Sequence, residues 1–158
     1  MARQLWLLRH GDAEPHGARA DFDRRLTERG RAEAAAAGRA LRALAVEFAT
    51  VLTSPKLRAA ETARLAAGAW AGTVQERQLL AAGLTAPDAL DLLAEEAADA
   101  RVLLVGHDPD LSRVLGDLTG ARIDLKKGGL VVVRAHGASG ELIRLLRPDD
   151  LKLIAGEG

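Results

Sequence analysis

Short runs of apolar residues that end in polar turns recur along this 158-residue chain. Residues 4–8 and 101–105 each contain four consecutive apolar side chains, followed by Arg-His-Gly or Gly-His. Continuous apolar runs of this length, bounded by turn residues, are typical of strands buried on both faces. We predict further strands at 48–52, 73–75 (an edge strand), 130–134 and 141–146, with a hairpin turn at 137–140 between the last two.

The segment after residue 26 has the composition and the boundary residue of a helix. Thr27 is the expected N-cap of an alanine-rich helix that runs to about residue 45. Leu41, Leu44 and Ala45 lie at helical spacing and are predicted to form its buried stripe. The polar segment before it, residues 12–25, is predicted to be a loop.

Prolines mark the starts of further helices. Ser54 and Pro55 are expected at the N-cap and first helical position of a helix that runs to about residue 67. Pro87 is expected to open a helix over residues 88–98, and Pro109 a helix that ends near residue 118. The chain after Pro148 carries no clear pattern.

The alternation of strands and helices predicts an α/β protein. We expect a three-layer α/β/α sandwich with a mostly parallel sheet, a hairpin at its end, and a single domain over residues 1–158. Hydrophobic residues make up 48% of the chain and charged residues 28%, as in globular proteins. The net charge of zero argues against a nucleic-acid or membrane partner held by bulk electrostatics.

Two further features bear on the compartment. Cysteine is absent, which excludes disulfides and thiolate sites. The first apolar run is shorter than the roughly 7–15 residues of a signal peptide, and no run approaches the roughly 20 residues of a membrane span. We therefore expect a cytoplasmic protein.

Charged residues suited to phosphate follow three of the predicted strands. Arg9 and His10 follow the first strand, Arg58 lies in the helix after the second, and His107 follows the other buried strand. Ligands of open α/β sheets bind at the carboxyl ends of the strands, so these side chains are predicted to converge there. Guanidinium groups fork onto phosphate oxygens, and a histidine kept neutral by cationic neighbours has a lone pair that can attack phosphorus. Gly11 allows the backbone to turn closely behind that ring.

Three sequence blocks resemble the signature of the histidine phosphatase, or phosphoglycerate mutase-like, superfamily. They are LWLLRHG at 5–11, LTSPKLRAAETA at 52–63 and VGHDP at 105–109. The small size and the segments RHGDA and LTERG are most similar to the SixA branch, whose members are described as protein phosphohistidine phosphatases. The resemblance spans about residues 4–146 and implies the phosphoglycerate mutase-like fold.

The resemblance also implies catalytic roles. His10 is expected to accept the phosphoryl group, which water later releases. Arg9 and Arg58 are expected to bind the phosphate, and His107 to hydrogen-bond the phosphoryl oxygens as they move. The family requires no metal, and we expect no cofactor.

Further expectations concern the substrate. Gly11 and Lys127 complete the predicted substrate-binding set, because Lys126 and Lys127 resemble a basic turn of SixA-like chains. The expected partner is a phosphorylated protein of the histidine phosphotransfer type, or a small phosphorylated molecule, and the protein is expected to be a monomer. A mutase is disfavoured because a short chain leaves little room for a lid.

One departure from the superfamily concerns the proton donor. Larger members carry a glutamate after the third strand that protonates the leaving oxygen, whereas residues 78–83 contain no acid and Glu76 is out of register. An alkoxide leaves poorly without a proton, but a phosphorylated imidazole carries its own. The absence of the acid therefore favours a phosphohistidine substrate, with Asp12 and Asp108 as possible substitutes.

Alternative interpretations remain open. Asp108 and Asp110 resemble the paired aspartates of Mg²⁺-dependent haloacid dehalogenase-type phosphatases, although that interpretation leaves the other two blocks unexplained. A non-catalytic phosphate-binding module is the second alternative. No phosphate-binding loop of the nucleotide-hydrolase type is present.

The remaining histidines and both tryptophans are given structural roles. His16 and His136 are predicted to be a loop residue and a hairpin residue, since no metal-ligand spacing connects them. Trp6 and Trp70 are predicted to be packing residues.

Overall fold

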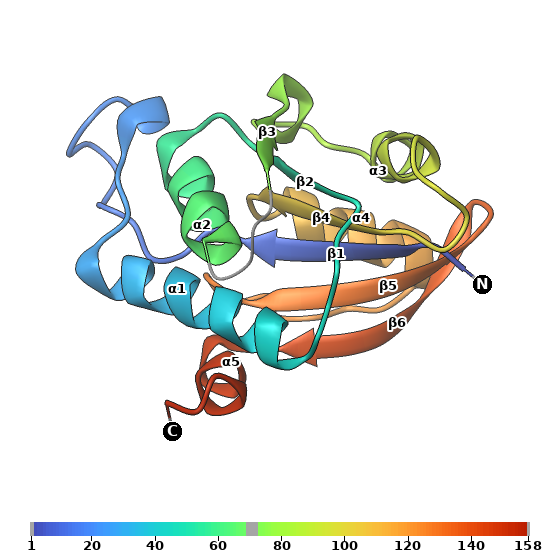
Figure 1. Cartoon of the computed structure of the whole chain (residues 1–158). Coiled ribbons are helices and arrows are strands. Elements are labelled where there is room, and N and C mark those ends of the chain that lie inside the picture. The colour runs from blue at the N-terminus through green and yellow to red at the C-terminus, as the bar shows by residue number, and fades with distance from the viewer. Residues whose placement is uncertain (1, 69–72, 158) are drawn as a thin grey trace.

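A mixed sheet forms the centre of the protein (Figure 1). The computed structural model describes residues 2–68 and 73–157, so Trp70 lies outside the described residues. Within them, six strands form one sheet in the order β3-β2-β4-β1-β5-β6. Their bounds are β1 (Gln4–Arg9), β2 (Thr50–Thr53), β3 (Val74–Glu76), β4 (Arg101–Gly106), β5 (Leu130–His136) and β6 (Ser139–Leu146).

The strand directions confirm the predicted α/β class. β3, β2, β4 and β1 run parallel, whereas β5 is antiparallel to β1, and β6 is antiparallel to β5. The buried strands, the edge strand β3 and the hairpin of β5 and β6 were all predicted from the sequence. The largest boundary differences are two residues: β2 begins two residues later than expected, β5 ends two residues later, and β6 begins two residues earlier.

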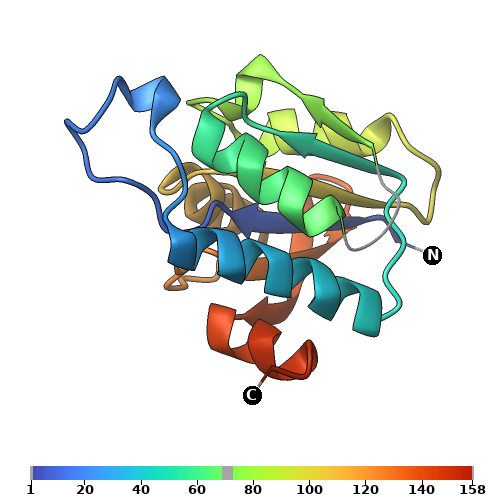
Figure 2. The ribbon, with the colours of Figure 1, turned by 60° about the vertical axis from the view of Figure 1, so that its left-hand side comes forward.

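Helices cover both faces of the sheet and complete the three layers (Figure 2). α1 (Glu28–Ala43), α2 (Leu57–Ala67) and α5 (Pro148–Ile154) lie on one face, and α3 (Ala86–Ala94) and α4 (Asp110–Thr119) on the other. Two short 3-10 helices, η1 (Asp21–Asp23) and η2 (Gln78–Leu80), lie in the connections. In the part of the chain that is described, no helix is long and apolar enough to cross a membrane.

Successive side chains of β1 point to opposite cores, as strand geometry requires. Leu5 and Leu7 belong to the core beneath α3 and α4, whereas Trp6 and Leu8 belong to the core beneath α1, α2 and α5. Trp6 is buried and packs edge-on against Phe48 at 5.4 Å between ring centroids, which confirms its predicted packing role.

The amino end of α1 was predicted correctly, but its buried stripe was not. Thr27 caps the helix, and its Oγ1 accepts a hydrogen bond from the Gly30 N–H at 3.1 Å. Leu41 is buried, but Leu44 is the C-cap and Ala45 is exposed, with a positive φ of 55°. Small residues form the contact with α2 instead: a Cβ added to Gly38 would lie 2.3 Å from the Ala66 carbonyl oxygen.

Some helix boundaries differ from the prediction. Ser54 and Pro55 precede α2, which begins at Leu57 with Lys56 as its N-cap. α3 begins at Ala86, with Thr85 as its N-cap and Pro87 in its first turn, close to the predicted start; it ends at Ala94, four residues earlier than expected. Pro109 is the N-cap of α4, close to its predicted place.

Candidate active site

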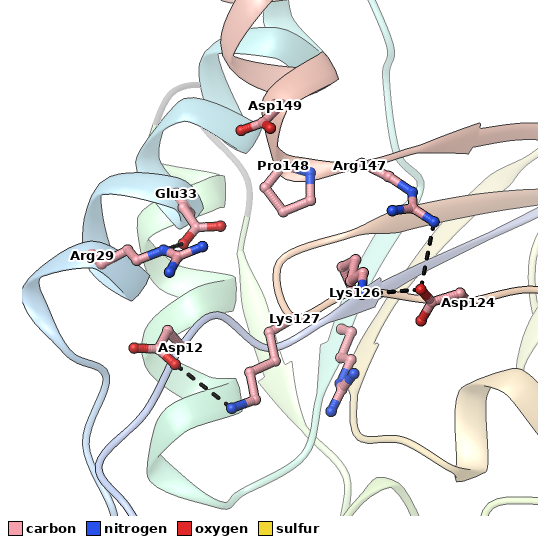
Figure 3. A pocket seen from close by; sticks show the side chains of 10 residues that line it. Asp12, Arg29, Glu33, Asp124, Lys126, Lys127, Arg147, Pro148 and Asp149 are labelled. Carbon is pink, nitrogen blue, oxygen red and sulfur yellow. Dashed lines mark hydrogen bonds and ion pairs between the residues drawn. The ribbon is translucent and has the colours of Figure 1, made fainter.

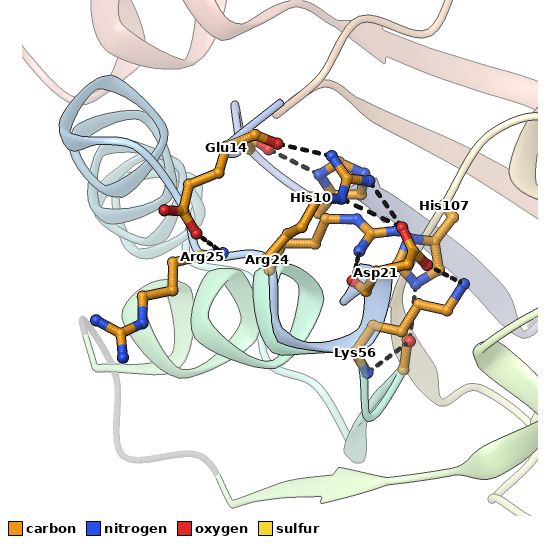
Figure 4. A network of polar contacts seen from close by, with 10 residues as sticks. His10, Glu14, Asp21, Arg24, Arg25, Lys56 and His107 are labelled. Atoms are coloured by element: carbon orange, nitrogen blue, oxygen red, sulfur yellow. Dashed lines mark hydrogen bonds and ion pairs between the residues drawn. The ribbon is translucent and has the colours of Figure 1, made fainter. Parts of the chain in front are cut away.

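Three strand ends bring the predicted site residues together, and Figure 4 shows two of them, His10 and His107, among the polar side chains around them. His10 follows β1, His107 follows β4, and Arg58 lies in the first turn of α2. Backbone hydrogen bonds of 3.0 Å from His10 N to Gly106 O and from Ser54 N to Val105 O hold these ends in register. The two imidazole centroids are 5.2 Å apart.

These side chains line a common cavity of about 220 Å³. Arg9, His10, Arg58, His107 and Lys127 all contribute to its wall. His10, Arg58 and His107 are buried, with 7%, 5% and 8% of their surface exposed. The four predicted catalytic residues and Lys127 therefore meet in space, although they come from distant segments.

The His10 ring is held in one tautomer. Its Nδ1 lies 2.7 Å from the Gly11 carbonyl oxygen. Because a carbonyl oxygen only accepts, we place the ring hydrogen on Nδ1, and Nε2 then carries the lone pair of the neutral imidazole. Burial lowers the pKa of His10 to about 4, assisted by Arg58, Arg9 and Lys127 and opposed by the hydrogen bond with Gly11. The ring is therefore neutral at pH 7.

His107 is held by a buried serine. Its Nε2 lies 2.7 Å from Ser54 Oγ, which also accepts a hydrogen bond from the Lys56 N–H at 3.1 Å. If Nε2 carried the hydrogen, both the serine proton and the Nδ1 lone pair would lack partners. We therefore infer that Ser54 donates to Nε2 and that Nδ1 carries the hydrogen.

The neutral state of His107 follows from its surroundings. Burial is the main cause that lowers its pKa to about 3, and the proximity of His10 and of the cations Arg58 and Lys56 lowers the pKa further. Among the described residues, the buried Nδ1 has no hydrogen-bond partner. A fixed, neutral N–H donor at this position is suited to an oxygen atom of a bound anion.

Backbone carbonyl oxygens anchor the two predicted phosphate-binding arginines. Arg9 donates from Nη1 to the Leu125 carbonyl oxygen at 2.8 Å, and Arg58 donates from Nη1 to the Asp21 carbonyl oxygen at 2.8 Å. In the described part of the chain, the buried Nε of each guanidinium has no partner. Each arginine is thus oriented by the protein while one donor remains unsatisfied.

The sequence analysis missed a cluster of charges in the loop 12–25. Asp21 accepts hydrogen bonds from Arg24 and lies within 3.1 Å of Lys56 and 3.4 Å of Arg58. Partial burial raises the pKa of Asp21, but its bonds with Lys56 and Arg24 outweigh this effect and hold the pKa well below its usual range. Arg24 is itself buried and lines the cavity. No helical or strand periodicity in this loop marked either residue.

Gly11 is required by a close approach of two backbones. A Cβ at this position would lie 2.8 Å from the Gly30 carbonyl oxygen, at the start of α1. The Gly11 N–H donates to Thr62 Oγ1 at 3.1 Å, and Thr62 Oγ1 donates to the Arg58 carbonyl oxygen at 2.7 Å. Gly11 therefore connects the His10 segment to both α1 and α2.

The acids near the cavity all have local partners. Glu14 accepts from the Arg25 N–H and from Arg19, and the Arg25 bond lowers its pKa. Asp108 accepts from the backbone and hydroxyl of Ser112. Glu14 and Asp108 line the cavity, whereas Asp12 lies outside its lining.

Other acids and histidines are placed as follows. Glu76 forms an ion pair with Arg64 outside the cavity. His136 is exposed and pairs with Glu141 on the hairpin, as a structural residue. His16 is exposed in the loop 12–25, where it was predicted, and it also contributes to the cavity wall.

The aspartates of the haloacid dehalogenase-type alternative do not share the cavity. Asp108 lines it, but Asp110 accepts a hydrogen bond from the Gly83 N–H at 2.9 Å and lies outside the lining. The fold and site together define a mixed α/β protein with a cationic cavity around two buried neutral histidines.

Comparisons with known proteins identify the family to which a protein of this class belongs. The sequence profile of the histidine phosphatase superfamily (branch 1) matches residues 5–81. An uncharacterized protein of Picosynechococcus sp. is 34% identical over 146 residues, which cover 85% of this chain and 87% of that protein.

Solved structures agree in fold. The protein histidine phosphatase SixA, in complex with tungstate, superposes with a TM-score of 0.83 at 26% identity, covering 94% of this chain and 99% of SixA. A protein of Nakamurella multipartitia proposed to be a SixA phosphohistidine phosphatase superposes with a TM-score of 0.78 at 28% identity. The match covers 94% of this chain and 97% of the Nakamurella chain. The chain belongs to the histidine phosphatase superfamily and is of the SixA type. This membership supports phosphatase activity.

Proposed function

We propose that the protein hydrolyses a phosphoryl group through a covalent intermediate on Nε2 of His10. The observation that supports this most directly is the state of the His10 ring. It is neutral, its hydrogen is fixed on Nδ1 by the Gly11 carbonyl oxygen, and it lies beside Arg9 and Arg58 in one cavity. A neutral imidazole held in this way is a competent nucleophile at pH 7.

In the first step, the Nε2 lone pair forms the N–P bond while the bond from phosphorus to the leaving group breaks. The guanidinium groups of Arg9 and Arg58 face the charge that develops on the phosphoryl oxygens. His107 donates from Nδ1 to one of these oxygens. Lys127, which also lines the cavity, adds a positive charge at its rim.

In the second step, water attacks the phosphorus of phosphorylated His10. The N–P electron pair returns to Nε2, the water oxygen becomes the fourth phosphate oxygen, and a water proton passes to phosphate or solvent. His10 retains its hydrogen on Nδ1 throughout, so it leaves as a neutral imidazole. Neither step requires a metal or a cofactor.

The substrate that this chemistry favours is a phosphohistidine on a partner protein. Both carboxylates that line the cavity already accept hydrogen bonds, and the pKa of Glu14 is lowered, so neither is suited to donate a proton to an alkoxide. A phosphorylated imidazole leaves as neutral imidazole, which avoids this need. The similarity to SixA, a protein histidine phosphatase, supports the same choice.

Turnover of p-nitrophenyl phosphate in excess EDTA tests the proposal. We expect activity that survives chelation and is lost in His10→Ala, with His136→Ala as a matched control on the distant hairpin. Activity that disappears with EDTA contradicts the metal-free mechanism. Binding of phosphate without turnover of any phosphoester or phosphoramidate supports a binding module instead.

A second assay separates substrate classes. A phosphohistidine peptide and small phosphomonoesters such as phosphoserine are compared by kcat/KM under the same conditions. We expect the peptide to be preferred. A preference for the small esters supports the alternative of a small-molecule phosphatase that shares the same nucleophile.

A further inference from the structure

A second cavity, of about 490 Å³, adjoins the proposed phosphate cavity (Figure 3). Arg9 and Lys127 line both cavities, so the two spaces meet at these side chains. The mechanism proposed above leaves the second cavity unused. A ligand with its phosphoryl group at His10 has space there for the atoms next to that group.

The charges in the second cavity are separated by sign. In Figure 3 the charged groups on one side are mostly acidic and those on the other mostly basic, with Lys127 between them. The acidic side carries Asp12, Glu33 and Asp149 with Arg29, and the basic side carries Lys126 and Arg147 with Asp124. Arg9 belongs to the basic side as well, because it donates to the carbonyl oxygen of Leu125, the residue between Asp124 and Lys126.

The acidic side is held by the fold. Glu33 is 4% exposed, and its Oε1 accepts a hydrogen bond from Arg29 Nε at 2.9 Å, whereas Arg29 itself is largely exposed. Asp12 Oδ2 accepts from Thr27 Oγ1 at 2.8 Å, and Asp12 Oδ1 lies 3.6 Å from Lys127 Nζ. A buried carboxylate and a tethered one therefore face the cavity from this side.

The basic side has more cations than acidic partners. Asp124 is shared by Lys126 Nζ at 3.0 Å and Arg147 Nη2 at 3.5 Å. One carboxylate cannot neutralise both cations, and Arg9 adds a third positive charge to this side. A carboxylate on the ligand complements this excess.

We propose that the second cavity recognises the residues that flank the phosphorylated histidine on a partner protein, and that it selects one acidic and one basic flanking side chain. The acidic side chain pairs with the Lys126 and Arg147 side, and the basic one with the Glu33 and Asp149 side. Residues three or four apart on a helix have Cβ atoms roughly 5–6 Å apart, so both flanking charges can lie close to the phosphorylated ring. Complementary charges of this kind fix register and reject wrong partners.

This inference rests on the proposed function and is tested with peptides. Four phosphohistidine peptides of equal length carry an acidic and a basic neighbour, the acidic one only, the basic one only, or neither. We expect kcat/KM to be highest for the first and about tenfold lower for the last, since exposed pairs are each worth about threefold. The preference is expected to shrink in 0.5 M NaCl because salt screens exposed charges.

Charge-reversal variants identify which side of the second cavity binds the acidic neighbour of the phosphohistidine and which side binds the basic one. Arg147→Glu is expected to reverse the preference for the acidic neighbour, and Asp149→Lys the preference for the basic one. Arg122→Gln is the matched control: Arg122 is an exposed arginine in the loop between α4 and β5, and it lines neither cavity. Its peptide preferences are expected to equal those of the wild type.

The outcomes separate this inference from the proposed function. If p-nitrophenyl phosphate is hydrolysed but kcat/KM is equal for the four peptides, the second cavity does not select charged neighbours and the inference is overturned. If a free phosphoamino acid reacts faster than every peptide, the cavity serves a small zwitterion and the protein partner is overturned. If nothing is hydrolysed by the wild type, the proposed function fails first.

Discussion

The hydrogen bond between Ser54 and His107 provides the sharpest test of the site. Ser54→Ala removes the hydroxyl that we infer donates to His107 Nε2 at 2.7 Å. It also removes the acceptor of the Lys56 N–H. Ser54 is fully buried, so water does not readily replace the lost group. We expect the free energy of unfolding to fall by about 1–3 kcal/mol, the cost of a buried polar group left unsatisfied.

The catalytic effect follows from the tautomer. Without Ser54, the His107 hydrogen is free to occupy either nitrogen, and only the Nδ1–H form donates to the phosphoryl group. Complete removal of one donor to an oxyanion costs about 100–1,000-fold in kcat. Loss of its orientation alone should cost less, about tenfold, and should appear in kcat more than in KM because the contact strengthens in the transition state.

Two measurements decide the matter. Steady-state kinetics with p-nitrophenyl phosphate gives kcat at a temperature where urea titration shows the variant to be folded, and ¹⁵N NMR of the imidazole reports which nitrogen carries the hydrogen. Thr119→Val, which removes a hydroxyl from α4 outside the cavity, is the control. A wild-type spectrum with the hydrogen on Nε2, or an unchanged kcat in Ser54→Ala, refutes the reasoning.

Three further predictions follow from the burial and the close contacts of the site. Because the pKa of His10 is about 4, the acid limb of kcat/KM is expected near pH 4, and a limb near 6.5 in the pH profile contradicts a buried nucleophile. Between pH 4 and pH 6.5 the unfolded chain binds more protons than the folded one, because His10 is protonated only in the unfolded state. The free energy of unfolding should therefore fall as the pH drops from 6.5 toward 4, by about 3 kcal/mol from His10 alone, and urea titration measures this change. Gly30→Ala should destabilise by about 1–3 kcal/mol or more, since its Cβ would lie 2.0 Å from the Asp12 carbonyl oxygen, whereas Gly116→Ala, with only an ordinary contact, should stabilise α4 slightly in the same assay.

The parts of the fold that could be predicted are those that leave a local signal in the sequence. The strands that precede His10 and His107 are buried on both faces, so each appears as a continuous apolar run. Strands of this kind end at the carboxyl edge of the sheet, which is why the four predicted catalytic side chains could be expected to meet.

The errors have a different origin. Ser54 has the residue type of an N-cap, but its hydroxyl contacts His107, a residue 53 positions away, and no local rule reports such a contact. The buried stripe of α1 was assigned to leucines because they are apolar, whereas the close approach to α2 requires small residues such as Gly38. Both errors come from tertiary contacts that override local preference.

The loop 12–25 shows why a chain of zero net charge can hold a strongly cationic cavity. Asp21 gathers Arg24, Lys56 and Arg58 around one carboxylate, so these like charges are partly balanced before any ligand arrives. Its carbonyl oxygen also accepts a hydrogen bond from Arg58, which fixes the direction of that guanidinium. In the proposed reaction, a phosphoryl group meets arginines that are already oriented, so little reorganisation is needed as charge develops in the transition state. Under this proposal, the position of the loop 12–25, and not the charge of Arg58 alone, determines whether the arginine can serve the reaction.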